Sequence, residues 1–304
     1  MSAEQRKHLV DMLARPADTG SLSTEALSIE EMRAGFAAMM DTMPVPAQVQ
    51  ATSTIIAGRR AVIVEPEESA RPGTILYFHG GSFMLGSPET AMSLTANLVV
   101  RTGIRAISLD YRLAPEHPYP AGINDAVAAY RALLDDGGDP QSIAFAGDSA
   151  GGGIAVAACL LERDAGLPLP AAVLTFSALL DATLTGASMT TKAGVDPFLT
   201  REGLLSSGQA YLAGQDPLEP LLSPAVCADM TGFPPLLLQV GTNELLLDDS
   251  TRLAQRALDA GVDVTLDVTA DVPHVFQAFA GTLDEADDAL DRAALFLTQR
   301  LIRR

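Results

Sequence analysis

A serine between small residues carries the strongest chemical signal in this 304-residue chain. Residues 147–151 read Gly-Asp-Ser-Ala-Gly, after a short apolar run and before a long run of small and apolar residues. A Gly-x-Ser-x-Gly pentapeptide between a strand and a helix is typical of a nucleophile elbow, a sharp turn that projects the serine hydroxyl above the sheet. We therefore predict that Ser149 is a nucleophile.

A serine nucleophile needs a general base, and the chain has four histidines. His8 falls in a charged amphipathic stretch and His117 in a turn-rich run, so a solvated or structural role is expected for both. His79 ends a predicted strand and opens a glycine loop. His274 follows the last predicted strand, where the base of a triad is expected in this kind of sheet. His274 is therefore the predicted base.

The acid that orients the base is expected in the loop after the preceding strand. Residues 242–249 read Thr-Asn-Glu-Leu-Leu-Leu-Asp-Asp, so Glu244, Asp248 and Asp249 all satisfy the chain order serine, acid, histidine. Glu244 is nearest to the end of the strand, whereas the two aspartates lie where carboxylates cap a following helix. We predict Glu244 as the acid, and Asp248 and Asp249 as helix caps.

The third part of such a site is a set of amides that bind the oxyanion. Residues 79–83 read His-Gly-Gly-Ser-Phe directly after a predicted strand, and glycines there let backbone amides approach a substrate carbonyl. The predicted oxyanion hole consists of Gly80, Gly81 and Ser82, together with Ala150 behind the nucleophile. A phosphate site does not fit, because Ser87 stands where a P-loop requires lysine.

Composition excludes several other classes. Twenty basic against 38 acidic residues give a net charge of −18, which repels the phosphates of nucleic acids. Cys159 and Cys227 lack the spacing of a zinc site or a disulfide framework, and no metal-ligand motif is present. The first fifteen residues are too charged for a signal peptide, and the most promising uncharged stretch for a membrane span, 165–180, is short and contains two prolines. A cytoplasmic protein is expected.

From about residue 52, short apolar runs rich in β-branched residues alternate with longer helix-type runs. Continuous apolar runs are typical of strands in a sheet that is covered on both faces. The predicted fold is α/β, with a mostly parallel central sheet flanked by helices. The expected strands are 53–56, 61–64, 75–78, 105–109, 143–146, 172–176, 236–240 and 264–268. The expected helices are 90–102, 122–134, 150–164, 250–260 and 284–300.

Two segments lie outside this alternation. Residues 1–46 carry two amphipathic stripes at helical spacing, one over 9–13 and one over 34–40. Almost sixty residues separate the strand that ends near 176 from the strand that begins at 236, and a connection of that length is usually a functional insertion. We predict that residues 1–46 and an insertion at about 181–225 form a helical cap, and that the core spans residues 47–304.

Four motifs together resemble the hormone-sensitive-lipase-like branch of the α/β-hydrolase esterases, also called bacterial family IV. They are His-Gly-Gly-Ser-Phe at 79–83, Tyr-Arg-Leu-Ala-Pro-Glu at 111–116, Gly-Asp-Ser-Ala-Gly-Gly at 147–152 and Pro-His-Val-Phe at 273–276. The resemblance covers the chain from about residue 53 onward. It implies an α/β-hydrolase core with a helical cap, and hydrolysis of carboxylic esters without a cofactor or a metal.

Within that resemblance, Glu244 takes the position of the family's catalytic aspartate, as in members that use glutamate there. Ser82 replaces the third glycine of the oxyanion loop, and Gly153 replaces the usual asparagine after the serine motif. Neither change removes a catalytic side chain, but Ser82 is expected to narrow the pocket. Family members often pair through the edge strand and the final helix, so the resemblance is compatible with a homodimer.

The predicted activity is hydrolysis of short- to medium-chain carboxylic esters through an acyl-enzyme on the serine. A lactone hydrolase with the same triad is the alternative among enzymes. A non-catalytic, receptor-like ligand-binding protein on the same fold is the alternative of another class, and the histidine argues against it. The expected partner is a small ester or lactone, with no nucleic acid and no membrane. The candidates for an apolar substrate pocket are Phe36, Met40, Phe83, Tyr211 and Phe276.

Overall fold

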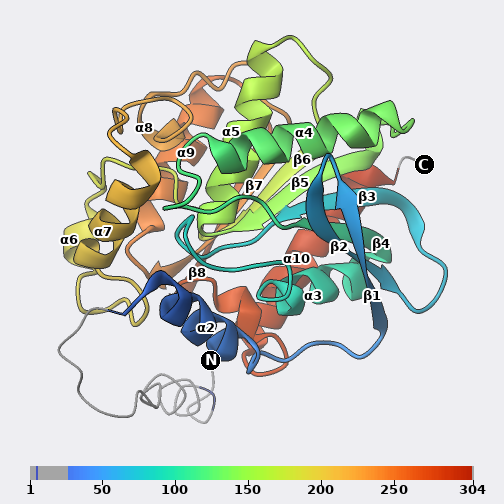
Figure 1. Cartoon of the computed structure of the whole chain (residues 1–304), viewed down its shortest axis with the longest axis horizontal. Coiled ribbons are helices and arrows are strands. Elements are labelled where there is room, and N and C mark those ends of the chain that lie inside the picture. Colours follow the sequence, from blue (N-terminus) through green and yellow to red (C-terminus); the bar gives the residue numbers. More distant parts are fainter. Residues whose placement is uncertain (1–4, 6–26, 303–304) are drawn as a thin grey trace.

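An eight-stranded sheet forms the centre of the structure (Figure 1). The computed structural model describes residue 5 and residues 27–302. The strands are β1 (Val49–Ile56), β2 (Arg59–Pro66), β3 (Arg71–Phe78), β4 (Ile104–Leu109), β5 (Ile143–Asp148), β6 (Ala172–Phe176), β7 (Leu236–Asn243) and β8 (Val264–Pro273). Their order is β1-β2-β4-β3-β5-β6-β7-β8, and every pair from β4 to β8 is parallel. The predicted, mostly parallel sheet is thus confirmed.

The first two strands form an antiparallel hairpin at one edge of the sheet. Ala57 and Gly58 connect them, and both have positive φ angles, of 50° and 77°. Two-residue turns with positive φ are favoured in hairpins because their twist matches that of the strands. The second strand then pairs antiparallel with β4, which joins the hairpin to the parallel part of the sheet.

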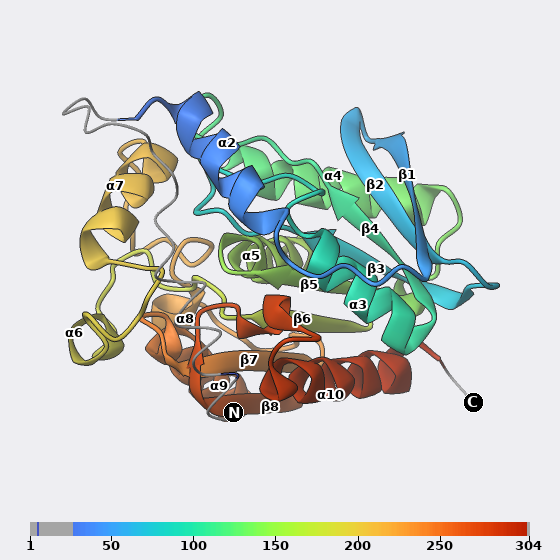
Figure 2. The same cartoon turned by 90° about the horizontal axis from the view of Figure 1, so that it is seen from below.

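Helices cover both faces of the sheet, as the alternation of patterns predicts (Figure 2). They are α3 (Met92–Thr102), α4 (Ala121–Asp135), α5 (Ala150–Asp164), α9 (Leu247–Asp259) and α10 (Asp284–Leu301). Apolar side chains of α4, α5 and α9 form one buried cluster, and those of α3 and α10 form a second. Each expected strand and helix is present. The last strand, β8, is longer than expected and ends at Pro273, which places His274 directly at its carboxyl end.

The described part of the N-terminal segment forms helix α2 (Ile29–Met40). Its second predicted stripe lies on this helix, whereas the first, over residues 9–13, lies outside the described residues. Ser28 and Glu31 form a capping box that defines where the helix begins. The connection between β6 and β7 contains α6 (Ser188–Thr191), α7 (Arg201–Leu212) and α8 (Pro224–Cys227). In both views α2 lies between α7 and the β1–β2 hairpin.

One arginine ties α2 to the loops beneath it. Arg33 Nε donates to the carbonyl of Met84 at 2.9 Å, and a terminal nitrogen donates to the carbonyl of Ala114 at 3.1 Å. Its two terminal nitrogens also pair with both carboxylate oxygens of Glu116 at 2.7 Å. None of the α2 side chains is completely buried. The helix is therefore attached over these loops by polar contacts and half-buried apolar ones.

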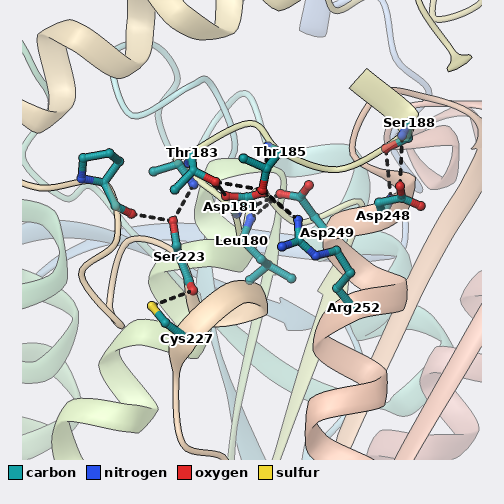
Figure 3. A network of polar contacts seen from close by, with 12 residues as sticks. Leu180, Asp181, Thr183, Thr185, Ser188, Ser223, Cys227, Asp248, Asp249 and Arg252 are labelled. Atoms are coloured by element: carbon teal, nitrogen blue, oxygen red, sulfur yellow. Dashed lines mark hydrogen bonds and ion pairs between the residues drawn. The ribbon is translucent and has the colours of Figure 1, made fainter. Parts of the chain in front are cut away.

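Carboxylates tie the inserted segment to the start of α9 (Figure 3). Asp249 accepts the amide hydrogens of Leu180 and Asp181, at 2.7 and 2.9 Å. The buried carboxylate of Asp181 pairs with Arg252 at 2.7 Å. Asp248 accepts the amide hydrogen of Ser188 at 2.9 Å. These contacts hold both the start of the insertion and the start of α6 against α9.

Those contacts correct one expectation from the sequence. Asp248 and Asp249 lie in the first turn of α9, but the residue at its N-cap position, Leu246, makes no side-chain capping bond. Both carboxylates instead accept amide hydrogens of the inserted segment. The local pattern of acidic residues before a helix cannot distinguish a cap on that helix from a contact with a distant loop.

Candidate active site

The predicted nucleophile sits on the sharp turn between β5 and α5. Ser149 has φ 51° and ψ −120°, a strained backbone conformation for a residue with a side chain. Its amide donates to the carbonyl of Phe176 at 2.8 Å, and its carbonyl accepts from the amide of Leu179 at 3.0 Å. A Cβ on Gly151 would overlap backbone carbonyls at the end of β3, so only glycine allows the helix to pass there. The turn is held on several sides at once.

Three side chains from three strand ends meet at this turn. Ser149 Oγ lies 3.0 Å from His274 Nε2, and His274 Nδ1 lies 2.9 Å from Glu244 Oε2. All three side chains are buried. Because a carboxylate only accepts hydrogen bonds, Nδ1 carries the ring hydrogen and Nε2 is left to accept from the serine hydroxyl. The arrangement can move a proton from the serine to the imidazole.

Of the three candidate acids, Glu244 is the one whose carboxylate reaches His274. Its other oxygen, Oε1, accepts the amide hydrogen of Gly241 at 2.6 Å and the hydroxyl hydrogen of Ser177 at 2.8 Å. Asp248 and Asp249 are engaged with the inserted segment. Glu244 therefore lies where a group that orients the imidazole has to lie, with both oxygens occupied.

The charges around His274 favour its protonated form. Burial by itself lowers the pKa of the imidazole, but the hydrogen bond and the negative charge of Glu244 outweigh it. Asp196 and Asp148 add to the same effect. The pKa of His274 is therefore raised from its ordinary value of 6.5. An imidazole of this kind holds a proton taken from a serine more firmly than a free one.

The glycine loop after β3 lies beside the serine with an unusual backbone. Gly81, Ser82 and Phe83 have positive φ angles of 121°, 54° and 62°. The carbonyl of Gly81 accepts the amide hydrogens of Met84 and Leu85, at 3.0 and 2.8 Å, which closes the loop into a tight turn. Within residues 27–302, the amides of Gly81, Ser82 and Ala150 have no partner in the protein.

The fourth predicted oxyanion residue, Gly80, has a different environment. Its amide interacts with the carboxylate of Asp148 and lowers the pKa of that group, and a Cβ at this position would overlap that carboxylate. Gly80 thus allows the loop to approach the elbow closely. Its amide is already engaged, which leaves the other three amides as the candidate donors.

A buried polar cluster supports this loop from below. Tyr77 Oη donates to Asp148 Oδ1 at 2.8 Å, and burial raises the pKa of Asp148 to about 6 against the effect of its hydrogen bonds. Tyr111 Oη donates to the carbonyl of His79 at 2.7 Å, and the two rings stack at 4.3 Å. Burial lowers the pKa of His79 to about 4, so the ring is neutral. His79 is thus a packed structural residue.

Sequence reasoning missed these supporting residues, Asp148 and Tyr77, and it also missed Ser177. A usable signal exists for two of them. Asp148 is the residue next to the nucleophile, and Ser177 directly follows the strand beside the nucleophile strand. Since the carboxyl ends of parallel strands share one edge, polar residues at those ends are expected near one another.

An apolar cavity of about 30 Å³ lies directly behind the elbow. Its walls include Gly153, one turn beyond the serine, Leu179, and the apolar faces of α7 and of the loop after α7. Phe83 and Tyr211 also line it, with their rings stacked at 3.8 Å. Two of the five predicted substrate-contacting residues therefore meet at this cavity.

The other three predicted pocket residues lie elsewhere. Phe36 and Met40 are half-buried on α2 and do not line the cavity. Phe276 is fully buried in an apolar cluster with α10 residues and Phe279, beneath the loop of His274. The position of Phe276 two residues after the base suggested a substrate contact, but its ring faces the core.

The remaining candidates have simple environments. His117 is exposed, and His8 lies outside the described residues. Cys159 and Cys227 are free thiols. Within residue 5 and residues 27–302, no three His, Cys, Asp or Glu side chains are grouped so that they could hold a metal ion. Over the same residues, none of the helices has the length and apolar character needed to cross a membrane.

The chain is similar in sequence to several proteins named as hydrolases or esterases. A family model described as the alpha/beta hydrolase fold matches residues 75–278. An acetyl-hydrolase from Streptomyces hygroscopicus is 46% identical over 224 residues, which cover 74% of this chain and 75% of that protein. An esterase from Acinetobacter venetianus is 37% identical over 251 residues, which cover 82% of each.

Solved structures agree with this similarity. The crystal structure of an esterase from the bacterial hormone-sensitive lipase family superimposes with a TM-score of 0.92 at 40% identity, and covers 99% of this chain and 100% of that one. A hormone-sensitive lipase from a metagenome library superimposes with a TM-score of 0.92 at 38% identity, over 99% of each chain. The chain therefore belongs to the α/β-hydrolase fold family, in its bacterial hormone-sensitive-lipase-like branch.

Proposed function

We propose that this protein is a serine carboxylesterase that hydrolyses small carboxylic esters through an acyl-enzyme. The observation that carries the proposal is the contact chain from Ser149 Oγ to His274 Nε2, and from His274 Nδ1 to Glu244 Oε2. Relatives named esterase and acetyl-hydrolase support the same reaction class. A histidine at hydrogen-bond distance from the serine also disfavours the receptor-like, non-catalytic alternative.

In the proposed reaction, Ser149 Oγ attacks the ester carbonyl carbon while His274 Nε2 takes the hydroxyl proton. The amides of Gly81, Ser82 and Ala150 donate hydrogen bonds to the oxyanion that forms. The imidazolium then gives its proton to the leaving alkoxide, which departs as an alcohol and leaves the acyl group on the serine. A water molecule repeats the sequence and releases the carboxylic acid and the free serine.

Glu244 serves both halves of this cycle in the same way. It accepts the Nδ1 hydrogen, which keeps Nε2 free to accept a proton, and its charge stabilises the imidazolium. The raised pKa of His274 sets the direction of the pH dependence. Since only the neutral imidazole can act as base, kcat/KM falls as the pH decreases through a value above 6.5.

The apolar lining of the cavity behind the elbow favours apolar groups on the ester, and its small size favours short ones. A volume of about 30 Å³ holds about two water-sized groups. We propose that α2 and the insertion containing α6–α8 act as a cap that limits the length of the bound chain. A cytoplasmic location and pairing into a homodimer remain predictions from the sequence.

A panel of p-nitrophenyl esters from acetate to decanoate, measured beside a set of lactones, tests this function. A lactone is the cyclic form of the same bond, so the ratio of the two activities separates the two predicted enzyme classes. Ser149→Ala is expected to fold normally and to lose turnover by about 10⁴-fold or more. Ser108→Ala is the matched control, because this serine is also buried, on β4, and its hydroxyl has no partner in the described protein. A folded Ser149→Ala protein with normal turnover would contradict the mechanism.

A further inference from the structure

A serine outside the predicted triad connects the loops of its acid and its base. We propose that Ser177 is a positioning residue, which fixes the carboxylate of Glu244 relative to the loop of His274 so that the two can act together in ester hydrolysis. This inference rests on the proposed function, because it concerns the alignment of the same three side chains.

The position of Ser177 in the fold makes this contact possible. It directly follows β6, the strand between β5, which leads to the nucleophile, and β7, which leads to the acid. Its amide donates to the carbonyl of Gln239 on β7 at 2.7 Å, and its side chain is fully buried. The hydroxyl therefore sits at the shared carboxyl edge of the strands, without access to solvent.

The hydroxyl is used in both directions. It donates to Glu244 Oε1 at 2.8 Å and accepts the amide hydrogen of Val275 at 3.0 Å. A hydroxyl has one hydrogen to donate and two lone pairs to accept with, and an amide can only donate, so these roles are fixed. Val275 directly follows His274. One side chain thus joins three segments that are far apart in the sequence.

This bridge determines which carboxylate oxygen faces the imidazole. Glu244 Oε1 is held by the hydroxyl of Ser177 and by the amide of Gly241, at 2.8 and 2.6 Å. The carboxylate plane is therefore fixed by two donors, and Oε2 is directed at His274 Nδ1. Without the hydroxyl, one amide alone would orient the group, and the carboxylate would gain freedom to turn away from the ring.

The backbone conformation of Ser177 favours glycine, which indicates that the hydroxyl is the reason for a serine at this position. Ser177 has a φ angle of 49°, in the left-handed region where a residue with a Cβ is strained and glycine is not. A glycine would fit the turn without strain, and the only polar contacts it would lose are those of the hydroxyl. The strained conformation is held by the contacts of the amide and the hydroxyl.

Two substitutions separate the hydroxyl from the backbone. Ser177→Ala removes the hydroxyl and keeps the strained Cβ, whereas Ser177→Gly removes both. We expect kcat for p-nitrophenyl butyrate to fall about 10- to 100-fold in both variants, as when a hydrogen bond to a charged group is lost. KM should change little, because Ser177 is completely buried and a bound substrate would not reach it. The acid limb of kcat/KM should move to lower pH, because the imidazolium loses part of the carboxylate interaction that raises its pKa.

Thr175→Val provides the matched control. Thr175 lies two residues earlier, on β6, is completely buried, and its hydroxyl has no partner within residues 27–302. This substitution removes a buried hydroxyl of the same region at nearly constant shape, and kcat should stay within about twofold of the wild type.

Thermal melting of each variant is measured beside the kinetics, so that a loss of activity can be distinguished from a loss of folding. Normal kcat and an unchanged pH profile in folded Ser177→Ala would overturn the proposal. Recovery of activity in Ser177→Gly alone would also overturn it, because backbone strain and not the hydroxyl would then be the cause. If the alanine variant fails to fold, the glycine variant gives the test. Absence of Ser149-dependent ester hydrolysis in the wild type would instead refute the proposed function itself.

Discussion

The assignment of Glu244 as the acid of the proposed triad can be tested by substitution, because the carboxylates of Glu244 and Asp248 have different contacts. Glu244 meets three donors: the imidazole, the amide of Gly241 and the hydroxyl of Ser177. In Glu244→Gln, one carboxylate oxygen becomes an NH₂ group, which can only donate. The backbone amide of Gly241 cannot accept a hydrogen bond, so the NH₂ group is expected to face His274 Nδ1. It then favours the imidazole tautomer with the hydrogen on Nε2, which cannot take a proton from the serine. We expect a loss of turnover of up to about 10⁴-fold with little change in melting temperature.

Asp248→Asn is the matched control for that experiment. Its carboxylate accepts an amide hydrogen of Ser188, which an asparagine carbonyl can also accept. The expected effect is on stability, by at most about 1 kcal/mol, the net contribution of one hydrogen bond. Steady-state kinetics and melting curves on both variants distinguish the two residues. If Asp248→Asn is the inactive protein, the acid has been placed wrongly.

Asp148 should affect the base through its charge. This carboxyl lies next to the nucleophile, and its charge is one of those that raise the pKa of His274. In Asp148→Asn that charge is absent, so the imidazole gives up its proton at lower pH. We therefore expect the acid limb of kcat/KM to move to lower pH, measured with a p-nitrophenyl ester between about pH 5 and 8. A limb that stays in place or moves upward would show that Asp148 acts only on the loop of Gly80.

At the scale of elements, α7 controls the cavity behind the elbow. The ring of Tyr211 on α7 stacks on Phe83, which directly follows the predicted oxyanion loop. Tyr211→Ala opens the cavity at this stack, so we expect kcat/KM for the octanoate ester to rise relative to that for the acetate ester. Leu205→Ala is the control, because Leu205 is exposed on the same helix. An unchanged ratio of the two esters would show that this cavity does not receive the substrate.

The N-terminal helix should influence selection of the substrate without holding the core together. None of its side chains is completely buried, and Arg33 makes its polar contacts with the loops beside the site. Arg33→Ala should therefore lower the melting temperature little, because half-exposed ion pairs contribute about 0–1 kcal/mol. Deletion of residues 1–41 should leave the sheet folded and change the preference for chain length. A deletion variant that is unfolded by circular dichroism would show that this segment belongs to the core.

At the scale of the whole molecule, the sheet and its helices could be predicted because their signals are local. Continuous apolar runs identify buried strands, and helical spacing identifies the helices between them. The order serine, acid, histidine could be predicted because each residue follows a strand of one parallel sheet. Contacts between distant segments could not be predicted in this way. The bridge made by Ser177, the engagement of Gly80 with Asp148 and the burial of Phe276 depend on packing between elements, which no local pattern records.

Stability and activity should respond to pH in opposite directions. The pKa of Asp148 is raised to about 6, and those of Asp249 and His274 are raised as well, so the folded protein takes up these protons at higher pH than the unfolded chain does. Protonation of these groups therefore stabilises the fold as the pH falls from about 8 toward 5. The net charge, −18 at pH 7, also becomes less negative as the pH falls, which weakens electrostatic repulsion within the molecule.

Below about pH 4.5, a further fall in pH lowers the stability of the fold instead of raising it. Glu89 and Glu116 are paired with Arg60 and Arg33, which lower the pKa of each carboxyl to about 2. The unfolded chain then takes up protons first, and the contribution of these pairs is lost as the pH falls toward 2. We expect the highest melting temperature between about pH 4.5 and 6, where the protonated base makes kcat/KM low. Melting curves and rates across this range, compared with Asp148→Asn, test the prediction. A melting temperature that falls together with activity from pH 8 to 5 would mean that acid inactivation is unfolding and not protonation of His274.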